Sequence, residues 1–232
     1  MIDESNLSII RKRLEKALSR RKNPTDHPIE IVAITKGFPT AFIVEAAELG
    51  LNNIGENRVQ EAEEKFPQLP KNIKIKRRMV GHLQSNKTRR AVELFDTIDS
   101  VDSLSLAKKL SLLGLARGAP VETQLQVNVD KDISKFGFDP NREEELLSAT
   151  NLEGINVTGL MTIGVFTTDE RLKRETFGGL REIRESLNSK LSQGRQLTHL
   201  SMGMSGDYEI AAEEGATMVR IGTALFGPRP EQ

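Results

Sequence analysis

The chain has 232 residues, in which 33 lysines and arginines balance 33 aspartates and glutamates, and it has no cysteine. A balanced charge creates no global field that would attract polyanions, which argues against nucleic acid or an anionic membrane as the main partner. The lack of cysteine excludes disulfides, thiolate metal sites and thiol nucleophiles. A chain of this length can bury a substantial core, and we expect a single domain over residues 1–232.

The N-terminus does not have the order of a secretory signal. It is acidic first and amphipathic afterwards, whereas a signal peptide places basic residues before an apolar stretch. No apolar run approaches the ~20 residues that are needed to span a bilayer. We therefore predict a soluble, cytoplasmic protein.

The first expected element is a helix over residues 3–21. Apolar side chains recur there at steps of three and four residues, between arginines and lysines, at Leu7, Ile10, Leu14, Ala17 and Leu18. The Asn23-Pro24 pair is expected to end this helix.

From residue 29, short apolar runs alternate with helix-like segments. The predicted strands are 29–35, 52–55, 74–80, 96–101, 120–129, 154–163, 197–201 and 217–222. The predicted helices are 40–49, 57–65, 86–94, 103–113, 141–149, 170–192 and 205–214. This order predicts an α/β fold, a (β/α)8 TIM-type barrel with an extra N-terminal helix. An open doubly wound sheet is the alternative. Residues 73–79 interleave apolar and basic side chains, whereas strands of a parallel sheet are usually apolar on both faces.

A lysine stands at the end of the first predicted strand, where parallel α/β folds collect their reactive groups. Lys36 directly follows the apolar run 31–34 and Thr35. Partial burial disfavours the charged form of an amine, and a neutral amine forms a Schiff base with an aldehyde. The alternative is a lysine that reaches from the strand end to water.

The segments after the last two predicted strands have the composition of an anion site. Ser201 offers a hydroxyl, and Gly203, Gly222 and Thr223 offer backbone N–H groups that can approach a ligand closely. A helix beginning at Ser205 would point its N-terminus nearby and favour negative charge. The alternative is that these glycines only turn the chain.

An aldehyde and a phosphate occur together in pyridoxal 5′-phosphate (PLP). Arg220, at the end of the last strand, stays protonated, so a pyridine nitrogen facing it would accept a hydrogen bond and remain unprotonated. Such a ring is a poor electron sink, which predicts a site that holds the cofactor and supports carbanion chemistry weakly. The alternative is a surface ion pair of Arg220 with Glu213 or Glu214.

Motifs from the first strand to the last, in order, carry a family resemblance. They read AITK (33–36), IGENRVQEA (54–62), VGHLQSNK (80–87), SVDS (100–103), SKFGF (134–138), GLMTIG (159–164), LSMGMSGDYEIAAEEGAT (200–217) and VRIGTALFG (219–227). The chain resembles the pyridoxal phosphate homeostasis proteins, the YggS/PROSC group, whose fold is like the barrel domain of alanine racemase.

The resemblance implies a role for individual residues. Lys36 would carry PLP as an internal aldimine, Asn57 would lie beside the ring, and Arg220 would face the pyridine nitrogen. The phosphate contacts would come from Ser201, Gly222 and Thr223, and we include Met202, next to Ser201, among the cofactor-binding residues. The implied function is to bind, buffer and deliver PLP, with PLP-dependent apoenzymes as recipients and without robust catalysis.

Two positions depart from the family pattern. The family often has a tyrosine after the GEN motif, where this chain has Arg58, and aromatic residues before VGHLQ, where it has Arg77, Arg78 and Met79. Neither change touches Lys36 or the expected phosphate site.

A PLP-dependent amino-acid racemase is the alternative function. Racemisation needs an acid and a base on opposite faces of the substrate carbon. Tyr208 is expected to pack inside a helix, so His82, at a strand end, is the best further proton carrier. Lys135 could replace Lys36 as the carrier of PLP, although we expect it to be a solvated surface lysine.

One cluster of basic residues could serve nucleic-acid or protein binding, although such runs usually form a solvated face. It contains Lys71, Lys74, Lys76, Arg77, Arg78, Lys87, Arg89 and Arg90. Metal catalysis is not supported, because His27, His82 and His199 are dispersed and no HExxH or acidic metal motif occurs.

Overall fold

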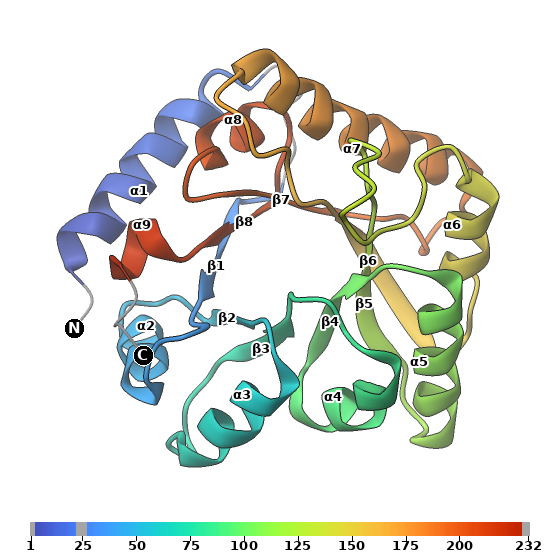
Figure 1. Cartoon of the computed structure of the whole chain (residues 1–232), viewed down its shortest axis with the longest axis horizontal. Helices are drawn as coiled ribbons and strands as arrows, with labels where there is room; N and C mark the ends of the chain where they lie inside the picture. Colours follow the sequence, from blue (N-terminus) through green and yellow to red (C-terminus); the bar gives the residue numbers. More distant parts are fainter. Residues whose placement is uncertain (1–2, 22–26, 229–232) are drawn as a thin grey trace.

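The computed structural model describes residues 3–21 and 27–228, and these form a closed barrel of parallel strands surrounded by helices (Figure 1). The strands follow one another around the barrel in chain order, and β1 pairs with β8 to close it. Their bounds are β1 Glu30–Ile34, β2 Asn53–Glu56, β3 Lys76–Met79, β4 Thr97–Val101, β5 Val121–Gln126, β6 Ile155–Met161, β7 His199–Met204 and β8 Met218–Ile221. The predicted (β/α)8 barrel is confirmed, and its closure excludes the open doubly wound sheet.

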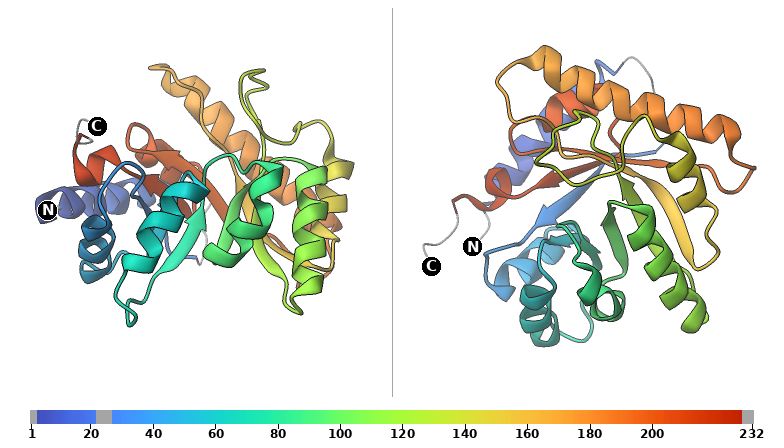
Figure 2. Two further views of the ribbon diagram at one scale, coloured as in Figure 1. Left: turned by 60° about the horizontal axis from the view of Figure 1, so that its bottom comes forward. Right: turned by 45° about the vertical axis from the view of Figure 1, so that its right-hand side comes forward.

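The helices lie outside the barrel (Figures 1 and 2). They are α1 Glu4–Leu18, α2 Thr40–Glu48, α3 Val59–Lys65, η1 Phe66–Gln68, η2 Ser85–Lys87, α4 Thr88–Leu94, α5 Leu104–Ala116, α6 Glu143–Thr150, α7 Glu170–Lys190, α8 Tyr208–Glu213 and α9 Thr223–Phe226. The extra N-terminal helix is confirmed as α1, which packs against α8 and α9, while Asn23 and Pro24 lie outside the described residues. Within those described residues, no helix combines the length and apolar character that crossing a bilayer requires.

Two apolar layers hold the barrel together. Val32 and Ile34 of β1 face the barrel interior, where they cluster with Val80 and Met218. The alternate residue Ala33 faces outward and belongs to the larger core between the strands and the helices. Because successive side chains of a strand point to opposite faces, the inward position that follows Ile34 belongs to Lys36.

The mixture of apolar and basic residues in β3 reflects an ion pair inside the barrel. Arg78 is 2% exposed and its Nη1 lies 2.9 Å from Oδ2 of Asp99 on the neighbouring strand β4. Arg77, on the outer face, pairs with Asp96 and lies over the ring of Phe66. The expectation of a solvated basic face is therefore wrong for Arg78, which a buried carboxylate neutralises.

The end of β7 differs from the prediction and changes what reaches the mouth of the barrel. The strand was expected to end at Ser201 but continues to Met204, and the following helix begins at Tyr208 instead of Ser205. Gly203 has a φ of +91° within an irregular stretch of the β7–β8 pairing, and a Cβ there would lie 2.5 Å from the Cβ of Ala211. A glycine that resembles a turn signal therefore allows the strand to continue close against α8.

Candidate functional site

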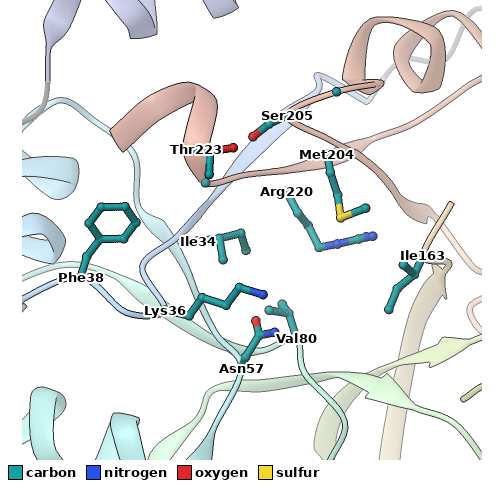
Figure 3. Close-up of a pocket in the computed structure, with 12 residues that line it drawn as sticks. Ile34, Lys36, Phe38, Asn57, Val80, Ile163, Met204, Ser205, Arg220 and Thr223 are labelled. Carbon is teal, nitrogen blue, oxygen red and sulfur yellow. The ribbon is translucent and has the colours of Figure 1, made fainter. Parts of the chain in front are cut away.

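A cavity of about 350 Å³ opens at the carboxyl-terminal mouth of the barrel, within the size range of small-molecule sites (Figure 3). Segments following six of the strands contribute to its wall. The lining residues are Ile34, Lys36, Phe38, Asn57, Val80, Ile163, Met204, Ser205, Gly206, Arg220, Gly222 and Thr223.

Lys36 projects into this cavity from the end of β1. Its side chain points toward Asn57 and Val80, on the side of the cavity opposite Ser205 and Thr223 (Figure 3). The residue is half-buried, and it follows the inward-facing Val32 and Ile34 in the alternation of the strand. The structure therefore directs the Lys36 amine toward the interior of the mouth.

Asn57 lies in close contact with a glycine on the neighbouring segment. It follows β2 and precedes α3, which begins at Val59 instead of at residue 57 as expected. A Cβ on Gly81 would lie 2.3 Å from the backbone oxygen of Asn57 and 2.7 Å from its Cα. Only a residue without a side chain lets the segment after β3 approach Asn57 this closely.

Arg220 is a buried guanidinium that faces the cavity from β8 (Figure 3). Its Nη1 donates to the carbonyl oxygen and the hydroxyl of Ser201, at 2.8 and 2.9 Å, and its Nη2 donates to the carbonyl oxygen of Thr162 at 2.7 Å. Burial lowers the pKa of Arg220 to about 10, so it stays charged at neutral pH.

The expected alternative for Arg220, a surface ion pair with Glu213 or Glu214, is wrong. Both glutamates pair with Arg174, and Glu213 also pairs with Arg20. Arg220 itself is 5% exposed and bonds to neutral oxygens.

Backbone N–H groups and hydroxyls gather at one end of the cavity. Gly222 caps the short helix α9, and the N–H groups of Leu225 and Phe226 donate back to its carbonyl oxygen, so only the N–H groups at the very start of the turn lack a partner within the helix. The Ser205 hydroxyl accepts a hydrogen bond from the N–H of Ala224 at 3.1 Å, which leaves its own hydrogen to donate. Together with Gly206 and Thr223, these groups form the part of the wall best suited to an anion.

Ser201, Met202 and Gly203 are not among the residues that line the cavity. Ser201 and Met202 have no exposed surface; Ser201 holds Arg220, and Met202 belongs to the hydrophobic core. Gly203 packs against Ala211 of α8. Because β7 is longer than predicted, Ser205 and Gly206 occupy the place at the mouth that the sequence assigned to these three residues.

His82 and Lys135 lie around the mouth and outside the lining. The Nδ1 of His82 is 2.8 Å from Oδ2 of Asp102, and its ring stacks on Phe136 with a centroid distance of 3.6 Å. The Lys135 Nζ pairs with Asp130 at 2.7 Å and also donates to the carbonyl oxygens of Ile163 and Gly164. Lys135 is thus not a solvated surface lysine, because it connects the segments that follow β5 and β6.

Seven lining residues were not among the predicted site residues: Ile34, Phe38, Val80, Ile163, Met204, Ser205 and Gly206. Of these, Ser205 was expected only as the start of a helix near the anion site. Ser205 and Gly206 could have been found by extending β7 through Gly203, since the apolar run continues to Met204. Across the part of the chain that the structure describes, no three histidine, aspartate or glutamate side chains are grouped to hold a metal ion.

Curated relatives match nearly the whole chain. The family model described as alanine racemase, N-terminal domain, matches residues 7–230. A pyridoxal phosphate homeostasis protein of Pasteurella multocida is 34% identical over 231 residues, which cover 99% of this chain and 98% of its own. That of Pseudomonas aeruginosa is 40% identical over 202 residues, which cover 87% of this chain and 85% of its own.

Solved structures of other proteins have the same barrel fold as this chain. PipY of Synechococcus elongatus, in a structure with PLP bound, is 38% identical with a TM-score of 0.80, over 93% of this chain and 99% of its own. Alanine racemase of Corynebacterium glutamicum, 17% identical with a TM-score of 0.73 over 100% of this chain and 63% of its own, shares the fold alone. The resemblance read from the motifs is confirmed: this chain belongs to the pyridoxal phosphate homeostasis protein family.

Proposed function

We propose that this chain binds PLP in the cavity at the barrel mouth, carries it covalently on Lys36, and stores and delivers it. The observation that carries the proposal is the convergence of an amine, a buried guanidinium and an anion-binding end on one cavity. The bound PLP of PipY, a relative of 38% identity, supports it.

The residues of the cavity fit three groups of the cofactor. The first turn of α9, with Gly222 and Thr223, and the Ser205 hydroxyl would bind the phosphate. Arg220 makes three hydrogen bonds with protein oxygens, while a guanidinium has five N–H groups, so a donor remains for the ring nitrogen. Asn57 would lie beside the ring.

Lys36 would act as the nucleophile toward the aldehyde. Its neutral amine would form a C=N double bond with the aldehyde carbon, and the aldehyde oxygen would leave as water. Water reverses this condensation, so the bond both retains the cofactor and permits its release. Recipients would be PLP-dependent apoenzymes.

The same residues favour a carrier over an enzyme. Bound PLP supplies an electron-withdrawing ring, which is strongest when its nitrogen is protonated. Arg220 stays charged and offers only hydrogen-bond donors, so it would leave that nitrogen unprotonated. The names of the relatives, homeostasis proteins, agree with this role.

The racemase alternative lacks a second proton carrier at the cavity. Among the lining residues, the ionisable side chains are those of Lys36 and Arg220. His82 is engaged with Asp102 and Phe136, and Tyr208 is buried in α8. The residues that line the cavity therefore do not supply the acid and base that racemisation needs on opposite faces of the substrate carbon.

A spectroscopic titration tests the proposal. Purified protein titrated with PLP should acquire a visible absorbance band that borohydride removes, whereas Lys36→Ala should acquire none. Lys109→Ala, at an exposed lysine of α5, is the matched control and should behave as the unmodified protein. A Lys36→Ala protein that keeps a reducible visible band would refute the assignment. Rapid exchange of the α-hydrogen of an amino acid in D₂O would favour the enzyme instead.

A further inference from the structure

A polar triad of two buried side chains and one partly exposed side chain lies behind the segment that carries Lys36. Lys65, in the last turn of α3, is 8% exposed, and Glu56, at the end of β2, has no exposed surface. The Lys65 Nζ lies 2.9 Å from Oε1 of Glu56 and 2.6 Å from Oε1 of Glu61. We refer to Glu56, Glu61 and Lys65 as the triad.

The triad bonds to the residues on both sides of Lys36. On one side, the Thr35 hydroxyl donates to Oε1 of Glu56 at 2.6 Å, and the Thr35 carbonyl oxygen accepts from Nζ of Lys65 at 2.8 Å. On the other side, the Gly37 N–H donates to Oε1 of Glu61 at 2.5 Å. Lys36 therefore lies between two backbone positions that one cluster fixes.

The triad acts from outside the cavity. None of its members is among the lining residues, and Thr35 faces outward where Lys36 faces inward. Gly37 has a φ of +72°, a conformation that side-chain-bearing residues rarely adopt, so the backbone turns sharply directly after Lys36. The bond to Glu61 stabilises that turn and with it the direction of the Lys36 side chain.

General stability does not explain this arrangement. Placing charged groups in the protein interior is costly, and well-packed apolar residues often replace a buried ion pair without loss of stability. The triad sits where its hydrogen bonds reach the one segment that carries the reactive amine. A cluster that supports a functional side chain has this location and this pattern of contacts.

We propose that Glu56, Glu61 and Lys65 are positioning residues, which fix the backbone on both sides of Lys36 and aim its amine across the cavity. The inference rests on the proposed function, because the amine must reach a bound aldehyde. It assigns the triad no contact with the cofactor.

Two variants and a matched control test this inference. Glu56→Gln/Lys65→Met removes the Glu56–Lys65 ion pair as a unit and leaves only the partly exposed Glu61 carboxylate without its lysine. Glu61→Ala removes the acceptor of the Gly37 N–H. The control, Lys76→Met/Glu122→Gln, removes a lysine–glutamate pair of 2.6 Å at the other end of the barrel. For each protein, stopped-flow absorbance gives the rate of the reducible bond to PLP, and visible circular dichroism gives the orientation of the bound ring.

Amide hydrogen exchange in the cofactor-free proteins supplies a readout that is independent of PLP. Both triad variants should exchange the Gly37 amide roughly tenfold faster, while amides of β4 to β6 stay protected. They should form the covalent bond ~10–100-fold more slowly, by analogy with the loss seen when the hydrogen-bond partners of metal-binding side chains are removed. The control should match the unmodified protein in both measurements.

Several outcomes would overturn the inference. The inference fails if the triad variants bond PLP within twofold of the normal rate and show unchanged circular dichroism and unchanged exchange of the Gly37 amide. Loss of folding in both variants would make the triad an element of overall stability and would also overturn it. If the unmodified protein never forms a reducible bond, the proposed function fails, and Gly37 exchange still decides whether the triad holds the segment.

Discussion

Arg220 of β8 donates from one nitrogen, Nη1, to both the backbone carbonyl oxygen and the hydroxyl of Ser201 on the neighbouring strand β7. Ser201 thus stands behind the guanidinium, while Arg220 itself lines the cavity. In the structure, the serine that the sequence predicts as a phosphate contact bonds to the arginine that lines the cavity. Its effect on the cofactor would be exerted through the direction of the Arg220 side chain.

Ser201→Ala should weaken both folding and binding. The substitution leaves a buried charged donor without one acceptor, which costs about 1.5–3 kcal/mol in free energy of unfolding. PLP affinity should fall several-fold because the guanidinium gains freedom. Urea unfolding and a PLP titration measure the two effects, with the exposed Ser148→Ala as control. Unchanged stability and affinity in Ser201→Ala would show that the carbonyl oxygen alone holds Arg220.

Gly81→Ala should displace Asn57. The added methyl group would lie 2.3 Å from the Asn57 backbone oxygen, closer than atoms can pack, so one segment must move. We expect a loss of about 1–3 kcal/mol in stability, the usual cost of overpacking, and weaker PLP binding. Gly178→Ala in α7 is the control, since its nearest neighbour would be 3.7 Å away. If Gly81→Ala binds PLP normally, the position of Asn57 does not matter for binding.

Replacing only one residue of the Arg78–Asp99 pair inside the barrel should lower the free energy of unfolding strongly. Arg78→Met leaves the fully buried Asp99 without its cation, which should cost about 3–5 kcal/mol in free energy of unfolding. Replacing both residues, as Arg78→Met/Asp99→Leu, should recover most of that loss. Urea unfolding compares the two variants. A double variant no more stable than Arg78→Met would contradict this explanation of the charges in β3.

Glu56→Gln should change the pH dependence of stability. Burial, opposed by Lys65 and Thr35, raises the pKa of Glu56 above its ordinary value of 4.5. A carboxyl group with a raised folded-state pKa stabilises the protein below the unfolded-state pKa and loses that contribution as pH rises through the folded-state value. Glutamine cannot lose a proton, so the variant should gain stability relative to the unmodified protein as pH rises above 4.5. The gain is at most about 1.4 kcal/mol per pH unit.

Urea unfolding of both proteins between about pH 4.5 and pH 8 gives this difference. A difference that stays constant, or that falls with pH, would mean that Glu56 titrates in the folded protein as it does in the unfolded chain.

Local sequence patterns were sufficient to predict the barrel and much of its mouth. Alternating strand and helix periodicities predicted eight strands, with a helix after each of the first seven, and strand ends in a parallel barrel meet on one side. Lys36, Asn57, Arg220, Gly222 and Thr223 were expected there, and all five line one cavity. Their contacts with PLP remain a proposal.

What escaped prediction depends on distant neighbours. The end of β7 depends on how Gly203 packs against Ala211, so the sequence did not indicate that Ser205 lines the cavity. The inward turn of Arg78 depends on Asp99, and the burial of Lys65 depends on Glu56. These pairs become visible only when strands and helices distant in the chain are brought together.

Chemical reduction can identify directly the residue that carries the cofactor. Protein saturated with PLP is reduced with borohydride and digested, and the modified peptides are sequenced by mass spectrometry. We expect one dominant modified peptide, with the reduced cofactor on Lys36. A dominant label on Lys135, or a protein that acquires no label at saturation, would contradict this assignment.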